Sequence, residues 1–317
     1  MRISVDKLVA FGWAFPLACL SLLLLPYAVE GDQQFYRDFY ANVGSFGLSD
    51  AYTFYNNRLG TKEPGYFLFV YLFSDWFDKD VVFSLVNGLL YYHIFLWLRR
   101  QRVSTFLYPL LACNFYLIVL SFSAERLKLA LTIFLVGYSL KGLFRYSVYA
   151  ISLVSHVQLI LLLVGTQVRR ALEVIRKLML GRVGLGFVSL FIILIGVLAL
   201  LFLLREHIEA KLAFYSGAWG GFGAMLKPLV FTFMAMFYSR ERKIEALFVS
   251  LPMVIASFFI GSERVVIFSY FVFMYYAASY RRGINVGVLT SAMFFAYKGI
   301  GFAMTMIELG DGFAGTY

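Results

Sequence analysis

Residues 8–29, LVAFGWAFPLACLSLLLLPYAV, form an uncharged apolar run that is long enough to cross a lipid bilayer as one helix. Arg2 and Lys7 precede this run, and no small-residue cleavage site follows it. We therefore expect a retained first membrane helix rather than a signal peptide. Further apolar segments of spanning length, or close to it, follow at 81–98, 103–122, 127–140, 183–204, 224–238, 244–261, 265–280 and 284–307.

The composition agrees with this pattern over the whole chain. Hydrophobic residues make up 61% of the 317 residues and charged residues 15%, with a mean hydropathy of +0.78. These values exclude a soluble domain. They predict an all-α, polytopic integral membrane protein with about 9–11 membrane helices, re-entrant or half-helices included. We expect residues 1–317 to form a single multi-span membrane domain.

The basic residues predict an orientation. If the N-terminus lies in the cytoplasm, the inner segments hold more than half of the 28 Lys and Arg residues and fewer than a quarter of the 18 Asp and Glu residues. This distribution follows the positive-inside rule and explains the net charge of +10 without a nucleic-acid partner. The outer face then carries two hydrophilic loops, within 30–80 and 205–223.

Two apolar segments do not fit a simple alternation across the membrane. Residues 64–77 are short for a span, so we expect an interfacial or dipping helix on the outer face. A single crossing by residues 146–166 would invert every later loop, so we expect a hairpin of two short half-helices there. Broken membrane helices are tolerated only where protein or water satisfies the backbone, which usually means a binding site.

A Glu-Arg pair occurs twice where one apolar segment ends and the next begins, in Ser-Ala-Glu-Arg at 123–126 and Gly-Ser-Glu-Arg at 261–264. In each case the Ser is the expected N-cap and the Arg falls in the first helical turn. Such a helix start attracts anions through its free N–H groups and its full charge. Because Glu125 and Lys128 are spaced for mutual pairing, we expect Arg126 to remain free for a ligand. We predict that Arg126 and Arg264 bind a lipid-linked phosphate or pyrophosphate.

The first outer loop mixes carboxylates with tyrosines, including Tyr36 and Tyr66. Acids bind sugar hydroxyls and aromatic rings stack on sugar faces, although an interfacial aromatic belt has the same composition. Asp32 and Glu63 each adjoin Gly or Pro-Gly turn residues that fix their position. Either is a candidate general base for an acceptor hydroxyl, and the sequence leaves the choice between them open. The more common role of such an acid is an N-cap or a surface acid.

Three further residues are candidates for the same site. His156 lies midway through the predicted hairpin, where a functional role and a hydrogen-bonded core role are equally expected. It has no metal-ligand partner at a suitable spacing, so no metal is expected. Lys227, just inside a predicted helix, is a candidate phosphate contact. Tyr215 precedes a glycine-rich stretch in the second outer loop, which we interpret as a lid over the site.

Five motifs occur in order along the chain: Asp32…Tyr36, Glu-Pro-Gly-Tyr at 63–66, Ser-x-x-Arg-x-x-x-Ala at 123–130, Ser-His at 155–156 and Glu-Arg at 263–264. Together they resemble the EpsG-like branch of the Wzy polysaccharide (O-antigen or capsule repeat-unit) polymerases. The resemblance covers residues from about 30 to 270. The basic stretch at 168–182 corresponds to nothing in that pattern.

The resemblance implies a bacterial inner-membrane, multi-pass glycosyltransferase whose active site faces the periplasm. Its substrates would be undecaprenyl-pyrophosphate-linked oligosaccharides, and the joined glycan would contribute to lipopolysaccharide or a similar surface polymer. Arg126, Arg264 and Lys227 would bind the pyrophosphate, His156 would bind or protonate it, and Tyr36, Tyr66 and Tyr215 would contact the glycan. No cofactor is implied. Membrane lipid surrounds the chain, and the resemblance leaves room for a chain-length regulator protein as a partner.

Three other functions compete with a polymerase. A flippase or transporter of lipid-linked oligosaccharide needs a cationic path open to both sides, whereas the charges here gather at one face. A membrane acyltransferase would carry a His or Arg/His pair on the inner loops, and none appears there. An O-antigen ligase uses the same donor, so the sequence does not separate it from a polymerase.

Overall fold

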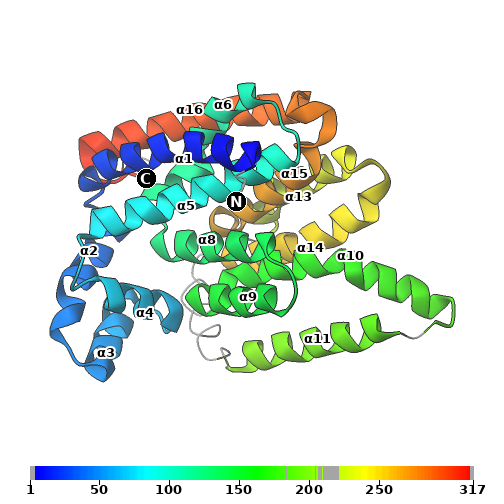
Figure 1. Ribbon diagram of the computed structural model, residues 1–317, viewed down its shortest axis with the longest axis horizontal. Coiled ribbons are helices and arrows are strands. Elements are labelled where there is room, and N and C mark those ends of the chain that lie inside the picture. Colours follow the sequence, from blue (N-terminus) through cyan, green and yellow to red (C-terminus); the bar gives the residue numbers. More distant parts are fainter. Residues whose placement is uncertain (1–3, 183, 204, 206–208, 210–220, 315–317) are drawn as a thin grey trace. The chain divides into compact units, whose positions relative to one another are not determined.

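The computed structural model describes residues 4–182, 184–203, 205, 209 and 221–314. Every regular element in this part of the chain is a helix (Figure 1). The predicted all-α class is therefore confirmed. The chain divides into two compact units, residues 1–159 with 281–317 (unit 1) and residues 160–280 (unit 2).

Unit 1 contains ten α-helices within its described residues. They are α1 (Val5–Leu24), α2 (Asp32–Asn42), α3 (Leu48–Leu59), α4 (Pro64–Phe73), α5 (Lys79–Arg100), α6 (Tyr108–Ala112), α7 (Phe115–Phe122), α8 (Glu125–Ser139), α9 (Leu143–Ser155) and α16 (Val286–Leu309).

Unit 2 contains five α-helices in the part that the structure describes. They are α10 (Ile160–Met179), α11 (Leu185–Leu203), α13 (Gly221–Tyr238), α14 (Lys243–Ile260) and α15 (Ser262–Ala277).

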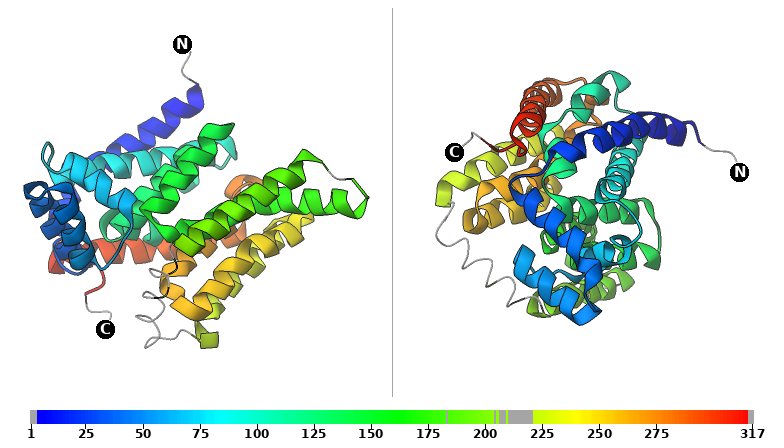
Figure 2. Two further views of the ribbon diagram at one scale, coloured as in Figure 1. Left: turned by 90° about the horizontal axis from the view of Figure 1, so that it is seen from below. Right: turned by 90° about the vertical axis from the view of Figure 1, so that its left-hand side faces the viewer.

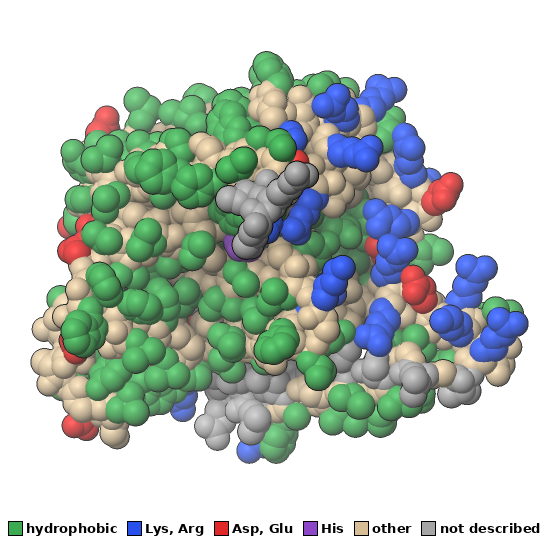
Figure 3. Space-filling model, in the orientation of Figure 1, with side chains coloured by type: hydrophobic (Ala, Val, Ile, Leu, Met, Phe, Trp, Pro, Cys, Tyr) green, Lys and Arg blue, Asp and Glu red, His purple; other side chains and the backbone are tan. Residues whose placement is uncertain are grey.

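Five segments among the described residues are long and apolar enough to cross a membrane, namely Val5–Tyr27, Lys79–Arg100, Gly221–Tyr238, Arg240–Ile260 and Tyr280–Leu309. Each coincides with a span expected from the sequence. Large apolar side chains are exposed along these helices, and Figure 3 shows apolar side chains over much of the visible face. Since exposed apolar surface on this scale needs a lipid environment, the chain is a multi-pass membrane protein.

One expected span is bent. The segment predicted at 103–122 is a pair of helices, Thr105–Ala112 and Phe115–Phe122, bent by 50°. Asn114 stands at the break, where its side chain accepts a hydrogen bond from the Tyr116 N–H. Gly299 of α16 approaches this break so closely that an added Cβ would lie 2.0 Å from the Cys113 carbonyl oxygen. The backbone of α16 therefore packs directly on the bend.

The predicted irregularity within 146–166 is confirmed in position and corrected in length. Helix α9 ends at Ser155, and His156 adopts an extended conformation (φ −163°, ψ 113°). A 3-10 turn, Val157–Leu159, precedes α10. However, α10 continues for 20 residues through the basic stretch, so the second arm is not a short half-helix. The apolar pattern stops near residue 166 because α10 becomes amphipathic there, not because the helix ends.

The expected outer loop at 30–80 is largely helical, since α2, α3 and α4 occupy most of it. An apolar core holds these three helices together (Figure 2, blue). Phe39 of α2 packs on Tyr55 of α3 with ring centroids 5.1 Å apart, and Tyr66 of α4 packs on Phe83 of α5 at 6.3 Å. This aromatic packing fixes α2 and α4 against α5, and it positions the polar residues described next.

Candidate functional site

Four side chains from separate elements of unit 1, Glu63 among them, form one connected group. Arg126 Nη1 donates to Glu63 Oε2 at 3.0 Å, and His156 Nδ1 lies 2.8 Å from Glu63 Oε1. The backbone N–H of Val157 also donates to Oε1, at 3.2 Å. Arg126 Nε donates to the Tyr36 hydroxyl at 3.2 Å. We call Tyr36, Glu63, Arg126 and His156 the Glu63 cluster.

The ends of helices place these groups. Glu63 occupies the N-cap position of α4, yet its side chain does not cap that helix and extends to its partners in α8 and at the end of α9. Arg126 lies in the first turn of α8, and His156 is the residue at which α9 stops. Pro64 begins α4 with the backbone angle that a helix start requires.

Gly65 allows the approach of α4 to α9. A Cβ added at Gly65 would lie 2.4 Å from Ser155 Oγ and 2.8 Å from the Ser155 backbone nitrogen. No larger residue fits this contact without a shift of the backbone. The glycine of the Glu-Pro-Gly-Tyr motif therefore brings Glu63 to the end of α9.

The Glu63 cluster is buried but retains some solvent access. The side chain of Glu63 is 4% exposed, that of Arg126 14% and that of His156 13%. Burial alone would raise the pKa of Glu63, but the charges of His156 and Arg126 and the Val157 N–H hold that pKa well below its ordinary value. Glu63 is thus an ionised carboxylate between Arg126 and His156. Burial raises the pKa of Tyr36 against the influence of Arg126, so Tyr36 stays a neutral phenol.

A second charged group lies on the other side of the first turn of α8. Glu125 Oε1 pairs with Lys79 Nζ at 2.5 Å, and Oε2 accepts from the Tyr66 hydroxyl at 2.8 Å. Lys79 also donates to Gln33 Oε1 at 2.9 Å. We call Gln33, Tyr66, Lys79 and Glu125 the Glu125 cluster. The Glu125 cluster adjoins the Glu63 cluster, since the rings of Tyr66 and Tyr36 meet edge to face with centroids 5.7 Å apart.

Two expectations around Arg126 are wrong. Glu125 forms its ion pair with Lys79 rather than Lys128, and Lys128 Nζ donates to the Ser121 carbonyl oxygen at 2.9 Å. Arg126 is not free of protein partners, because Glu63 and Tyr36 contact it. Spacing along one helix identifies only the neighbours on that helix, whereas these partners come from α2, α5 and the start of α4.

The remaining predicted residues have different surroundings. Asp32 is exposed at the first position of α2, one turn before Tyr36. Tyr66 belongs to the Glu125 cluster. Lys227 is exposed on α13 of unit 2. Arg264 falls in the first turn of α15, in unit 2, and its side chain is not among those described. Tyr215 lies outside the described residues, as does most of the loop predicted at 205–223.

Lys79 and Gln33 are structural partners that we did not single out from the sequence. A signal for Lys79 existed, because a lysine at the start of an apolar span needs an anionic partner or access to water.

The start of α5 also carries Asp78, whose side chain caps α5, and Asp80, which pairs with Arg37 at 2.9 Å. Arg37 also donates to the carbonyl oxygens of Leu25 and Ala28, and so ties α2 to the end of α1.

This geometry offers an anion-binding guanidinium beside an imidazole and a carboxylate. A guanidinium group has five N–H donors, of which the contacts with Glu63 and Tyr36 occupy one on Nη1 and the one on Nε. Metal binding has no comparable support, since no group of three or more His, Cys, Asp or Glu residues converges within the described part of the chain.

Together, the fold and site define a multi-pass helical membrane protein with a nearly buried Arg–Glu–His cluster at the ends of its helices. No protein-family model, no curated protein and no solved structure matches the chain. The cluster itself is therefore the starting point for the function.

Proposed function

We propose that this chain is a glycosyltransferase that joins polyprenyl-pyrophosphate-linked oligosaccharide repeat units, a polysaccharide polymerase of the inner membrane acting at its periplasmic face. One observation carries the proposal. Tyr36, Glu63, Arg126 and His156 belong to separate motifs of the sequence pattern, and they meet in one cluster. A chance set of weak motifs would not be expected to converge in this way.

The reaction needs a site for an anionic leaving group and an acceptor of one proton. The acceptor hydroxyl attacks the anomeric carbon of the donor, and a glycosidic C–O bond forms. The bond from that carbon to the pyrophosphate oxygen breaks, and the lipid pyrophosphate departs with the bonding electrons. The proton of the acceptor hydroxyl passes to a base.

Arg126 is assigned to the leaving group. Its guanidinium offsets negative charge as the pyrophosphate departs, which is electrostatic stabilisation of the transition state. His156 is assigned as the second contact, which either binds the phosphate oxygens or protonates one of them. Its Nδ1 faces Glu63, and its Nε2, which lies 3.3 Å from Gln158 Oε1, is the nitrogen that would turn to the phosphate.

We assign Asp32 as the general base. Glu63 has a depressed pKa, and a carboxylate that is stabilised in its ionised form is a weak proton acceptor. Its role is to orient Arg126 and His156. Asp32 is exposed on α2 and lies one helical turn from Tyr36, on the face that adjoins the cluster. It is therefore the carboxylate available to an acceptor hydroxyl.

The apolar surfaces of the membrane helices would accommodate the polyprenyl chains. Arg264 and Lys227 remain proposed as pyrophosphate ligands, and Tyr215 as a glycan contact, from the sequence alone. Tyr66 is better assigned to support of α8, because its hydroxyl is bonded to the buried Glu125.

The test is the surface glycan profile of a strain that lacks this chain, complemented with the parent, Arg126→Ala or Arg58→Ala and resolved as a ladder on a gel. Arg58 pairs with Asp38 on the surface, with each side chain 38% exposed, so its variant serves as the control. Loss of the long ladder for Arg126→Ala, with single repeat units still exported, is the expected result.

Two other results would contradict the proposal and identify a different function. Loss of even the single unit, with lipid-linked repeats accumulating inside, identifies a flippase. Long polymer that stays on its lipid carrier identifies a ligase. Protein levels in the membrane fraction are measured in parallel, so that a failure of folding is distinguished from a loss of activity.

A further inference from the structure

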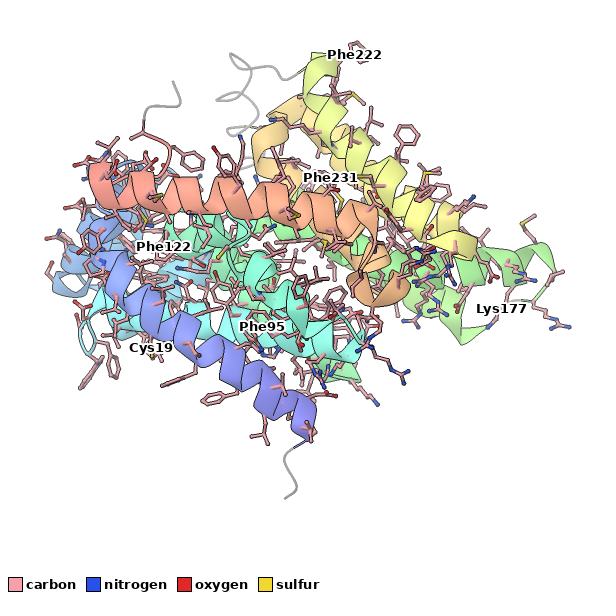
Figure 4. The ribbon with its side chains drawn as sticks, turned by 90° about the horizontal axis from the view of Figure 1, so that it is seen from above. Cys19, Phe95, Phe122, Lys177, Phe222 and Phe231 are labelled. Atoms are coloured by element: carbon pink, nitrogen blue, oxygen red, sulfur yellow. The ribbon has the colours of Figure 1, made fainter. Side chains whose placement is uncertain are left out.

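The C-terminal half of α10 carries a concentration of positive charge that the proposed reaction does not use. Within residues 169–182 the only acid is Glu173, and Arg169 Nε donates to it at 3.2 Å. The cations of this segment are Arg169, Arg170, Arg176, Lys177 and Arg182. Figure 3 shows Lys and Arg side chains at the end where α10 and α11 meet in Figure 1. Figure 4 labels Lys177 in this region.

Helical geometry separates these charges from an exposed apolar strip. At about 100° per residue, Arg169 and Arg176 lie on one face of α10, while Ile175 and Met179 lie together on an adjoining face. Ile175 is 52% exposed and Met179 83% exposed. The inward face is a third one, where Val174 is buried, and α10 packs along α14. The helix thus offers its surroundings a basic strip beside an apolar strip.

The basic end of α10 is followed directly by a turn and an apolar helix. Gly181, in the left-handed region at φ +70°, follows the end of α10, and α11 begins at Leu185. Helix α11 is apolar throughout and exposes Phe191, Ile192 and Phe202 by more than half, as expected of a lipid-facing helix. Figures 1 and 2 show α10 and α11 as a hairpin joined at this turn. The basic strip therefore lies beside the turn that joins α10 to an apolar helix.

We propose that the C-terminal half of α10 is a binding site for anionic phospholipid headgroups. Ile175 and Met179 enter the acyl boundary, and Arg169 and Arg176 bind the lipid phosphates beside them. Lys177, about 80–100° further round the helix, adds positive charge through its long side chain. An exposed apolar strip beside clustered Lys and Arg residues is typical of helices that lie in the plane of the membrane interface. This site does not depend on the glycan chemistry proposed above.

The test uses the full-length protein purified in detergent, with lipid binding followed by native mass spectrometry. Phosphatidylglycerol is the anionic probe and phosphatidylcholine the zwitterionic one. Each basic residue near an anionic surface adds a favourable electrostatic contribution. We therefore expect R169Q/R176Q/K177Q to bind phosphatidylglycerol at least about tenfold more weakly than the parent, with phosphatidylcholine binding unchanged.

Two matched variants complete the design. R100Q/K141Q/K243Q removes the same charge from scattered exposed positions and should retain binding within about twofold of the parent. R169K/R176K keeps the charge and should also retain it, because a diffuse headgroup attraction needs charge rather than guanidinium geometry.

Three results would overturn the proposal. The first is phosphatidylglycerol binding by R169Q/R176Q/K177Q at the level of the parent. The second is equal loss in the R169K/R176K variant. The third is a parent that does not distinguish the two lipids, which would leave an acidic protein surface as the partner of α10.

Discussion

Glu63 Oε1 lies 2.8 Å from His156 Nδ1, at the residue where α9 stops being a helix. The contact joins the turn before α4 to the break before α10, and the Val157 N–H completes it. Because Glu63 also binds Arg126, this single carboxylate sets the geometry of both the guanidinium and the imidazole. Both the stability of unit 1 and the proposed chemistry should therefore respond to changes at Glu63 and at the groups that support it.

Replacement of Glu63 by Gln should lower stability at neutral pH. Removing one partner of a buried charge pair costs about 3–5 kcal/mol, and here Arg126 would remain uncompensated. The folded-state pKa of Glu63 is depressed below the ordinary 4.5. Its contribution is therefore fully present above that value and is lost as the pH falls through the folded pKa. The parent and Glu63→Gln should differ in unfolding midpoint at pH 7 and converge progressively below about pH 4.5.

Thermal unfolding of the detergent-purified protein measures this difference. Asp38→Asn is the control, because Asp38 pairs with Arg58 on the surface and exposed pairs contribute at most about 1 kcal/mol. A deficit of Glu63→Gln that does not shrink as the pH is lowered from about 7 to about 3 would contradict the ion-pair explanation.

Asp32→Asn and Glu63→Asp should separate the roles of the two acids. If Asp32 is the base, Asp32→Asn reduces glycan joining about 100-fold or more with no change in unfolding midpoint, since its side chain is exposed. Glu63→Asp shortens the reach to Arg126 and His156 and should reduce both stability and joining. The measurement is ladder formation per amount of membrane-inserted protein, with the midpoint determined alongside. A stable Asp32→Asn variant with normal ladder formation would remove Asp32 from the mechanism.

Lys79→Met should destabilise unit 1 strongly, because it leaves Glu125 charged with a side-chain exposure of 0%. The expected cost is about 3–5 kcal/mol. The double variant Lys79→Met/Glu125→Gln should recover only part of it, since it removes the unpaired carboxylate but leaves the buried Lys128 without its nearby anion. Lys62→Met, at an exposed position, should stay within about 0.5 kcal/mol of the parent. Additive losses in the double variant would show that the two residues are not coupled.

Gly65→Ala should separate Glu63 from His156. The new methyl group would meet Ser155 at 2.4–2.8 Å, so α4 and α9 must move apart, and overpacking of this kind costs about 1–3 kcal/mol. Gly12→Ala provides the control, because no atom lies within 4 Å of a Cβ at that helical position. We expect Gly65→Ala to lose glycan joining and Gly12→Ala to retain it. Normal joining by Gly65→Ala would mean that the Glu63–His156 contact is dispensable.

Parts of the candidate site could be predicted from the sequence. The Pro-Gly sequence after Glu63, the helix break at His156 and the Arg in the first turn of α8 each carry a local signal, although Pro64 and Gly65 begin α4 rather than form a turn. The structure brings Glu63, Arg126 and His156 into one cluster. The pairing of residues from different helices could not be predicted. Lys79 and Glu125 lie in different helices, and the period of a single helix carries no information about which face of another helix it meets.

The sequence by itself determined the all-α membrane class and the approximate positions of the spans, because hydropathy and helix length are local properties of the chain. It also showed a basic stretch at 168–182, but not that this stretch continues α10 as a helix. Only the tertiary structure decided that Glu63 pairs with Arg126 and His156, that Glu125 pairs with Lys79, and that Gly65 contacts Ser155. These contacts depend on how α4, α5, α8 and α9 pack. The packing of α4, α5 and α8 is set by the aromatic core around Tyr55, Tyr66 and Phe83, and α9 packs on α8 through Tyr149 and Phe134. These residues come from separate helices and come together only when those helices assemble.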